Sequence, residues 1–306
     1  MSPSAHYRAV REELARGRTV ILDGAIGTEI LRRNRTWADH QLAQQPDFVR
    51  AIHEDYIRSG ADVISTNSFQ LCRRALYSHF RDTWHRRHIG ARDLDDRANR
   101  LLAASVRLAI EARERAAAGR PVAVAAAVTT LAWCFRPDLA PSESQAREEY
   151  GEIFQVVAEA GADLVLLETV NSITEARVAL EVAKALGLPC WIAFVPDERG
   201  RLFTGEALEQ AVAELEPRGV DAILLNCAPP DDILLGLTQL APHARVPIGA
   251  YAHIGRFDPP EWMFTDEYPP AKYQEVAARW KQTGSRILGG CCGTTPDHIA
   301  ALAALR

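Results

Sequence analysis

The stretch AGADLV, residues 160–165, ends an amphipathic segment on a glycine and starts an apolar run with an aspartate. Near-copies stand at 59–64 (SGADVI) and 218–223 (RGVDAI), and TGSRIL at 283–288 is a looser copy. Glycine often ends a helix because it adopts the left-handed backbone conformation at no steric cost. The repeat therefore predicts one kind of helix-to-strand junction that is used several times along the chain.

Eight short apolar runs recur along the sequence, each rich in Val, Ile, Leu and Ala and without polar alternation. Such runs are typical of strands that are buried on both faces of a parallel sheet. They occupy residues 19–25, 62–69, 121–129, 163–169, 189–195, 221–227, 246–253 and 286–292. The amphipathic segments between them predict helices. These segments include 47–59, 95–117, 144–160, 172–186, 206–217, 229–241 and 268–283, and 294–306 follows the last run.

Eight strand–helix units in 306 residues predict an α/β fold, a single (β/α)8 TIM barrel over residues 1–306. A doubly wound open sheet is the competing architecture. It more often carries a G-x-G-x-x-G turn after its first strand, and DGAIGTE at 23–29 lacks that spacing. A barrel places its chemistry at the C-terminal ends of the strands.

The composition is that of an ordinary globular protein, with 47% hydrophobic and 25% charged residues and a net charge of −5. Arginines alternate with acidic residues and form no basic stripe, so we expect no nucleic-acid partner. No apolar stretch approaches the ~20 residues that cross a bilayer, and residues 1–18 are too charged for a signal peptide. We therefore expect a cytoplasmic protein that does not bind membranes.

Polar side chains stand at the ends of the predicted strands, where a barrel would gather them on one rim. They are Asp23, Asn67, Ser68, Thr129, Thr130, Glu168, Asn226, Cys227, Tyr251, His253, Cys291 and Cys292. Ser68, Thr129 and Thr130 could equally be strand-end caps. As a set, the residues predict an active site.

Three of the six cysteines predict a metal site. Cys227 ends the sixth strand, and the adjacent pair Cys291 and Cys292 ends the eighth, between glycines that permit a tight turn. Barrel closure can bring these ends together, and three thiolates leave the fourth tetrahedral position of a zinc ion to water or substrate. The other cysteines, Cys72, Cys134 and Cys190, are isolated, and of these only Cys134 could line the pocket.

Five motifs resemble, in order and over nearly the whole chain, the homocysteine S-methyltransferase family. They are LDGAIGTE at 22–29, ADVISTNSF at 61–69, LLETV at 166–170 with TEA at 174–176, LLNCAPP at 224–230 and GGCCGTTPDHI at 289–299. The resemblance implies a (β/α)8 barrel that holds zinc on Cys227, Cys291 and Cys292. It also implies that Asp23 and Glu168 help to hold an amino-acid substrate. Further expected substrate contacts are Gly24, Thr28, Asn67, Ser68, Asn226 and Tyr251.

The chemistry of the residues agrees with this resemblance. Coordination to zinc deprotonates a thiol, so the fourth ligand becomes a thiolate that can attack a methyl group. We expect homocysteine as the acceptor, methionine as the product, and S-methylmethionine or S-adenosylmethionine as the donor. The barrel leaves no room for a cobalamin or folate domain, which favours a self-contained donor. Alternatives are a betaine-type donor, another thiol or a selenol as acceptor, a zinc hydrolase, or a non-catalytic methyl- or metal-binding module.

Three segments depart from the expected family pattern. Residues 129–141 are bulky, residues 251–260 carry His253 where relatives often have Asn, and 78–94 is rich in Arg and His. For 78–94 we expect a solvated loop. The first two departures leave the predicted zinc chemistry intact but leave the methyl donor open.

Overall fold

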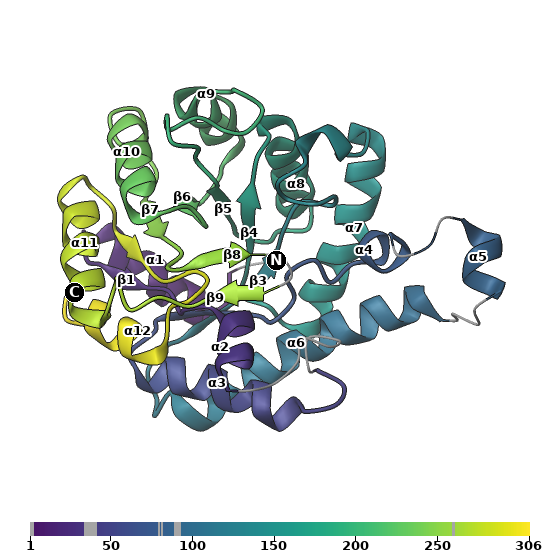
Figure 1. Ribbon diagram of the computed structural model, residues 1–306, viewed down its shortest axis with the longest axis horizontal. Helices are drawn as coiled ribbons and strands as arrows, with labels where there is room; N and C mark the ends of the chain where they lie inside the picture. Colours follow the sequence, from purple (N-terminus) through teal and green to yellow (C-terminus); the bar gives the residue numbers. More distant parts are fainter. Residues whose placement is uncertain (1–2, 34–41, 79, 81, 89–92, 259–260) are drawn as a thin grey trace.

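Eight parallel strands form the centre of the computed structural model, which describes every residue except 1–2, 34–41, 79, 81, 89–92 and 259–260 (Figure 1). The sheet runs in the order β1-β10-β7-β6-β5-β4-β3-β2, and a parallel bridge between Leu22 and Val63 links its two ends. The predicted (β/α)8 barrel is thus confirmed. Its strands are β1 (Val20–Ile21), β2 (Val63–Ser65), β3 (Ala123–Val128), β4 (Leu164–Val170), β5 (Cys190–Phe194), β6 (Ala222–Asn226), β7 (Ile248–Tyr251) and β10 (Ile287–Leu288).

Helices surround the strands, because each amphipathic segment turns its apolar face toward the sheet. The larger ones are α1 (Ala5–Ala15), α2 (Ile26–Arg32), α3 (Pro46–Arg58), α6 (Leu94–Ala116), α7 (Glu143–Ala160), α8 (Ile173–Ala185), α9 (Leu208–Leu215), α10 (Pro230–Leu240), α11 (Pro270–Gln282) and α12 (Pro296–Ala303). Shorter ones are α4 (Arg73–Tyr77), α5 (Thr83–His88), and the 3₁₀ turns η2 (Pro137–Leu139) and η3 (Glu216–Arg218). None of the described helices is long and apolar enough to cross a membrane.

The repeated junction has a clear structural role at the N-terminal end of the barrel. Its glycines, Gly60, Gly161 and Gly219, all have positive φ, between 79° and 104°. Each following aspartate accepts a hydrogen bond from a backbone N–H of the neighbouring strand. These pairs are Asp62 with Ile21 (2.9 Å), Asp163 with Val124 (2.7 Å) and Asp221 with Cys190 (2.9 Å). The repeat therefore joins each of three strands to the strand before it.

Helix α1 covers the same end of the barrel, which the sequence reading did not foresee. Its Tyr7 is buried with the residues of the barrel interior, and the Trp191 indole N–H donates to the Tyr7 hydroxyl at 3.1 Å. With this end filled by side chains, the cavity described below lies at the opposite end.

Seven of the eight predicted strands are shorter than their apolar runs, and two of them bear on the site. The run 286–292 gives a strand only over Ile287–Leu288, and 62–69 gives one only over Val63–Ser65. In both, the chain leaves the sheet near its C-terminal end, and the backbone freed from strand pairing shapes the site.

Two unpredicted elements lie in the divergent segments. Beyond β7, β8 (Arg256–Asp258) and β9 (Glu261–Met263) form a separate antiparallel hairpin. The described part of 78–94 is mostly exposed, although Phe80, His85 and Arg86 are half-buried and Leu94 is buried, and it includes the helix α5, so the expected loop is wrong there. Figure 1 shows α5 projecting away from the barrel. Residues 79, 81 and 89–92 of that segment lie outside the described residues.

Candidate active site

A cavity of about 290 Å³ opens at the C-terminal ends of the strands. The residues that line it come from the ends of β1, β2, β4, β6, β7 and β10, so the fold gathers them from distant parts of the chain. Most of the predicted site residues are among them: Asp23, Gly24, Thr28, Asn67, Glu168, Cys227, Tyr251, Cys291 and Cys292. Ser68, Thr129, Thr130, Asn226 and His253 do not line it.

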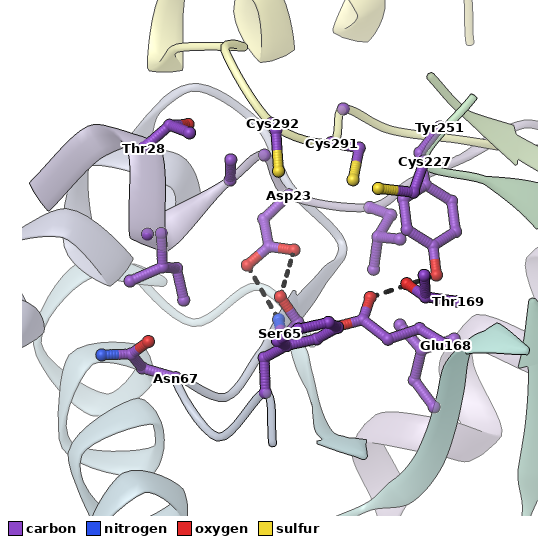
Figure 2. A pocket seen from close by; sticks show the side chains of 18 of the residues that line it. Asp23, Thr28, Ser65, Asn67, Glu168, Thr169, Cys227, Tyr251, Cys291 and Cys292 are labelled. Carbon is purple, nitrogen blue, oxygen red and sulfur yellow. Dashed lines mark hydrogen bonds between the residues drawn. The ribbon is translucent and has the colours of Figure 1, made fainter. Parts of the chain in front are cut away.

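The three predicted metal ligands converge at one wall of this cavity. The sulfur atoms of Cys227, Cys291 and Cys292 all lie within 4.8 Å of one another (Figure 2). A tetrahedral zinc ion bound at ~2.3 Å requires sulfurs roughly 3.8 Å apart. Hydrogen bonds from Cys227 and Cys291 hold the pKa of Cys292 well below its usual range. The donor set therefore suits a thiophilic metal ion with one side open to the cavity.

The turn that carries the adjacent cysteines is fixed by α2. The N–H of Gly293 donates to Thr28 Oγ1 at 2.8 Å, and Arg32 donates to the Gly293 carbonyl at 2.8 Å. Gly293 has a φ of 87°, and a Cβ there would collide with the carbonyl oxygen of Ile254. The geometry thus explains both the glycine and Thr28, whose hydroxyl lies at the cavity edge and anchors the cysteine turn.

Asp23 forms a second wall of the cavity. Its two carboxylate oxygens accept hydrogen bonds from the backbone N–H (2.8 Å) and the hydroxyl (2.9 Å) of Ser65. Burial raises the pKa of Asp23 well above its usual value, although the bonds from Ser65 oppose that shift. Ser65 was not predicted as a site residue, because it lies inside an apolar run and only its position beside Asp23 gives it a role.

Glu168 lies opposite, in β4. The Tyr251 hydroxyl donates to Glu168 Oε2 at 3.3 Å, and burial raises the pKa of Glu168 to about 7. Neither Glu168 nor Asp23 forms an ion pair with any described residue. Figure 2 shows both carboxyl groups on the same side of the cysteine sulfurs. The cavity wall therefore carries two acidic groups, the buried Asp23 and the half-buried Glu168, that have no cationic partner among the described residues.

Two of the predicted contacts lie behind the cavity wall. Ser68 is buried and donates to the carbonyl oxygen of Ala127 at 2.8 Å. Asn226 is fully buried and hydrogen-bonds to Thr169, which does line the cavity. Asn226 is the last residue of β6, whereas Ser68 lies three residues beyond the end of β2, and neither residue lines the cavity.

Aromatic side chains complete the cavity. Phe69 and Tyr251 come from the barrel, and Phe257 and Trp262 come from the β8–β9 hairpin. The Trp262 ring packs edge-on against His253, with ring centroids 5.7 Å apart. The sequence reading missed the hairpin aromatics, although the cluster of Phe and Trp at 257–264 was a usable signal.

The remaining cysteines, Cys72, Cys134 and Cys190, are buried free thiols that do not line the cavity. Burial raises the pKa of Cys134 to about 12, and burial also raises the pKa values of Cys72 and Cys190. Cys134 therefore does not take the lining position that the sequence allowed for it.

Comparisons with known proteins agree with this geometry. A family model described as homocysteine S-methyltransferase matches residues 20–305. The chain is 28% identical over 307 residues to homocysteine S-methyltransferase YbgG of Bacillus subtilis, covering 93% of each protein. It is 28% identical to a selenocysteine Se-methyltransferase of Brassica oleracea var. italica, covering 94% of this chain and 88% of that protein. The metallated form of the homocysteine methyltransferase MmuM from Escherichia coli matches with a TM-score of 0.80 at 27% identity, covering 98% of this chain and 99% of that one.

Proposed function

This chain belongs to the homocysteine S-methyltransferase family, and on that premise we propose that it transfers a methyl group to the thiol of homocysteine and forms methionine. The membership confirms the resemblance that the sequence motifs suggested. Relatives named for homocysteine and for selenocysteine both align over most of the chain, so a selenol is the second candidate acceptor.

One observation carries the proposal: three clustered thiols and two carboxyl groups that form no ion pair with a described residue face the same cavity. An amino acid with a thiol side chain presents an ammonium group at one end and sulfur at the other. The ammonium would supply the cation that Asp23 and Glu168 lack, and the sulfur would reach Cys227, Cys291 and Cys292. A substrate without either group would leave one wall of the cavity unmatched.

The metal that we propose is zinc, held by the three cysteines. The clustered sulfurs fit it, since thiolates favour zinc over hard cations such as magnesium. A zinc ion bound there would lower the pKa of an incoming thiol, so that the sulfur reacts as a thiolate. The residues of the protein contribute to the reaction by orienting the two substrates.

In this mechanism the residues of the chain orient the acceptor. Asp23 and Glu168 hold the ammonium end, which directs the sulfur toward the cysteines. The thiol proton leaves to solvent, and the sulfur then forms a bond to the methyl carbon of the donor. The bond from that carbon to the donor's positive atom breaks, and its electron pair stays on the departing neutral product. Holding both reactants in line is itself a large part of such catalysis.

For the donor we propose a small sulfonium, S-methylmethionine or S-adenosylmethionine. The support is the aromatic wall, since Phe69, Tyr251, Phe257 and Trp262 offer ring faces that attract a positive sulfonium or quaternary nitrogen. A betaine-type donor carries the same kind of charge and is the second candidate.

The test is a donor and acceptor panel on purified protein loaded with zinc. We expect methionine from homocysteine with at least one sulfonium donor, and no product from a Cys292→Ser variant that has lost its metal. Selenocysteine in place of homocysteine, and betaine in place of the sulfonium, complete the panel. Failure to form a methylated product with every donor–acceptor pair would refute the proposed activity.

A further inference from the structure

Thr169, directly after Glu168, has an unusual backbone conformation. Its φ is 60°, a left-handed value that is strained for a β-branched residue. Here the register between β4 and β5 shifts, with a bulge between Leu167 and Val170. Such strain persists only where the surroundings hold it in place.

The bulge changes which residues of β4 face the cavity. In a regular strand, alternate residues point to the same face. Leu166, Glu168 and Thr169 all line the cavity, whereas Val170 packs in the outer core between the strands and the helices. The bulge therefore turns two consecutive side chains, Glu168 and Thr169, toward the substrate.

The Asn226 side chain holds this conformation through two hydrogen bonds. Its Oδ1 accepts from the Thr169 backbone N–H at 3.1 Å, and its Nδ2 donates to Thr169 Oγ1 at 3.0 Å. Asn226 is 0% exposed and comes from β6, so it reaches across the end of β5 to β4. Without its amide, the buried Thr169 N–H would lose the partner that the structure gives it, which is costly in a protein interior.

We propose that Asn226 is a positioning residue for Glu168. The Thr169 N–H belongs to the peptide group that joins Glu168 to Thr169, and fixing this peptide fixes the ψ angle of Glu168. Asn226 thus sets the direction of the carboxyl group from behind the cavity wall. The inference rests on the proposed role of Glu168 in binding the substrate's ammonium group.

The same side chain also couples two parts of the site. Asn226 directly precedes Cys227, which has a φ of 51°, and Thr169 directly follows Glu168. The pair of hydrogen bonds therefore ties the proposed ammonium-binding carboxyl to one of the metal-binding thiols. The separation of the two ends of the substrate site is set by this link.

The first test measures the link itself and needs no activity. In Asn226→Ala, hydrogen exchange of the Thr169 amide should become at least tenfold faster than in the unaltered protein. Asn171→Ala is the matched control, because Asn171 is also buried in this segment but its side-chain amide has no hydrogen-bond partner among the described residues. Unchanged exchange in Asn226→Ala would overturn the proposal.

The second test measures the consequence for the substrate. Asn226→Ala should raise KM for homocysteine at least tenfold, and Asn171→Ala should not. Adding Thr169→Gly to Asn226→Ala should recover part of the loss, because glycine adopts positive φ without support. Neither a direct substrate contact by Asn226 nor a general packing defect would be rescued in this way, so absence of rescue would overturn the positioning role.

A double-mutant cycle separates this inference from the role of Glu168. If Asn226 acts through Glu168, Asn226→Ala should add little to KM in a Glu168→Gln background. Full additivity would overturn the positioning role. If Glu168→Gln alone leaves KM unchanged, the proposed ammonium site fails, and the positioning role for substrate fails with it, whatever the exchange experiment shows.

Discussion

Glu168 is a half-buried carboxyl group that accepts a hydrogen bond from the Tyr251 hydroxyl, and its environment makes ionisation costly until a cation arrives. Burial raises its pKa from 4.5 to about 7. Near neutral pH, Glu168 therefore changes between its neutral and its negatively charged form. Its attraction for the ammonium group of a substrate changes over the same pH range. This single residue links substrate affinity, pH and stability.

We expect Glu168→Gln to raise KM for homocysteine at pH 8 at least tenfold and to remove any rise of KM between pH 8 and pH 6. In the unaltered protein, KM should rise over that range because Glu168 becomes neutral. Steady-state kinetics at several pH values test this, with metal content as the control. An identical pH profile of KM in both proteins would contradict the assignment.

The same substitution should stabilise the fold. The pKa of Glu168 is higher in the folded protein than in the unfolded chain, so the unfolded chain ionises first as pH rises. The free energy of unfolding therefore falls as pH increases from 4.5 to about 7. Glu168→Gln should therefore increase the free energy of unfolding at pH 8 by up to roughly 3 kcal/mol, with the gain shrinking toward zero at pH 4.5. Urea unfolding at the two pH values measures it.

His53, a fully buried histidine in α3, offers an independent pH prediction. Neither ring nitrogen has a hydrogen-bond partner among the described residues, and burial lowers the pKa of His53 to about 4. Because the unfolded chain takes up the proton first, stability should fall by roughly 3 kcal/mol as pH drops from 6.5 to 4. His53→Leu should flatten this part of the stability profile, whereas His243→Ala, at an exposed residue, should leave it unchanged.

At the scale of elements, the strand junctions divide structural from functional acids. Asp163 stands before β4, accepts from Val124 N–H at 2.7 Å and pairs with Arg113 at 2.8 Å. Asp23 and Glu168 stand at the opposite ends of strands, beside the cavity. In a (β/α)8 barrel, a polar residue at the N-terminal end of a strand indicates a structural role, and one at the C-terminal end indicates a functional role.

Asp163→Ala should accordingly lower the free energy of unfolding by about 3 kcal/mol, because it leaves the buried Val124 N–H and Arg113 without their acceptor. Its kcat and KM should not change. Glu152→Ala, which breaks an exposed ion pair with Arg73, should have little effect on stability. Loss of activity in folded Asp163→Ala protein would show that the two ends of the barrel are not independent.

A feature of the fold or of the candidate site could be predicted only where the sequence contains a physical signal for it. The strand-end acids and cysteines were found because parallel strands bring their C-terminal ends together, whatever the loops do. The direction of the Asn226 side chain was not predicted, because it depends on the bulge at Thr169. No local sequence pattern indicates that bulge. The β8–β9 hairpin was missed because its three-residue strands are exposed and lack the apolar run that marked the others.

At the scale of the whole molecule, the barrel core supports the cluster of Cys227, Cys291 and Cys292, the proposed metal site. Leu164, Leu166 and Trp191 are buried in the barrel interior, and Cys291 packs against the cluster that they form. The sulfurs stand within 4.8 Å of one another on a turn that α2 holds by hydrogen bonds. The site is thus preformed by packing, in contrast to small domains that fold around their metal.

Removal of the metal by a chelator should therefore abolish methyl transfer while the far-UV circular dichroism stays unchanged and the thermal midpoint moves by only a few degrees. Adding zinc back should restore activity. Cys292→Ser, already without metal, serves as the control in which the chelator has no further effect. Cooperative unfolding on chelation would show instead that the metal is part of the fold.

The β8–β9 hairpin pairs only with itself and supplies Phe257 and Trp262 to the cavity wall. Its sequence can therefore vary without disturbing any ladder of the barrel, and without touching the cysteines or the two acids. Random libraries confined to Phe257 and Trp262 would sample new donor preferences on an unchanged scaffold. In evolutionary terms, this is a place where a lineage can exchange one methyl source for another while retaining its acceptor.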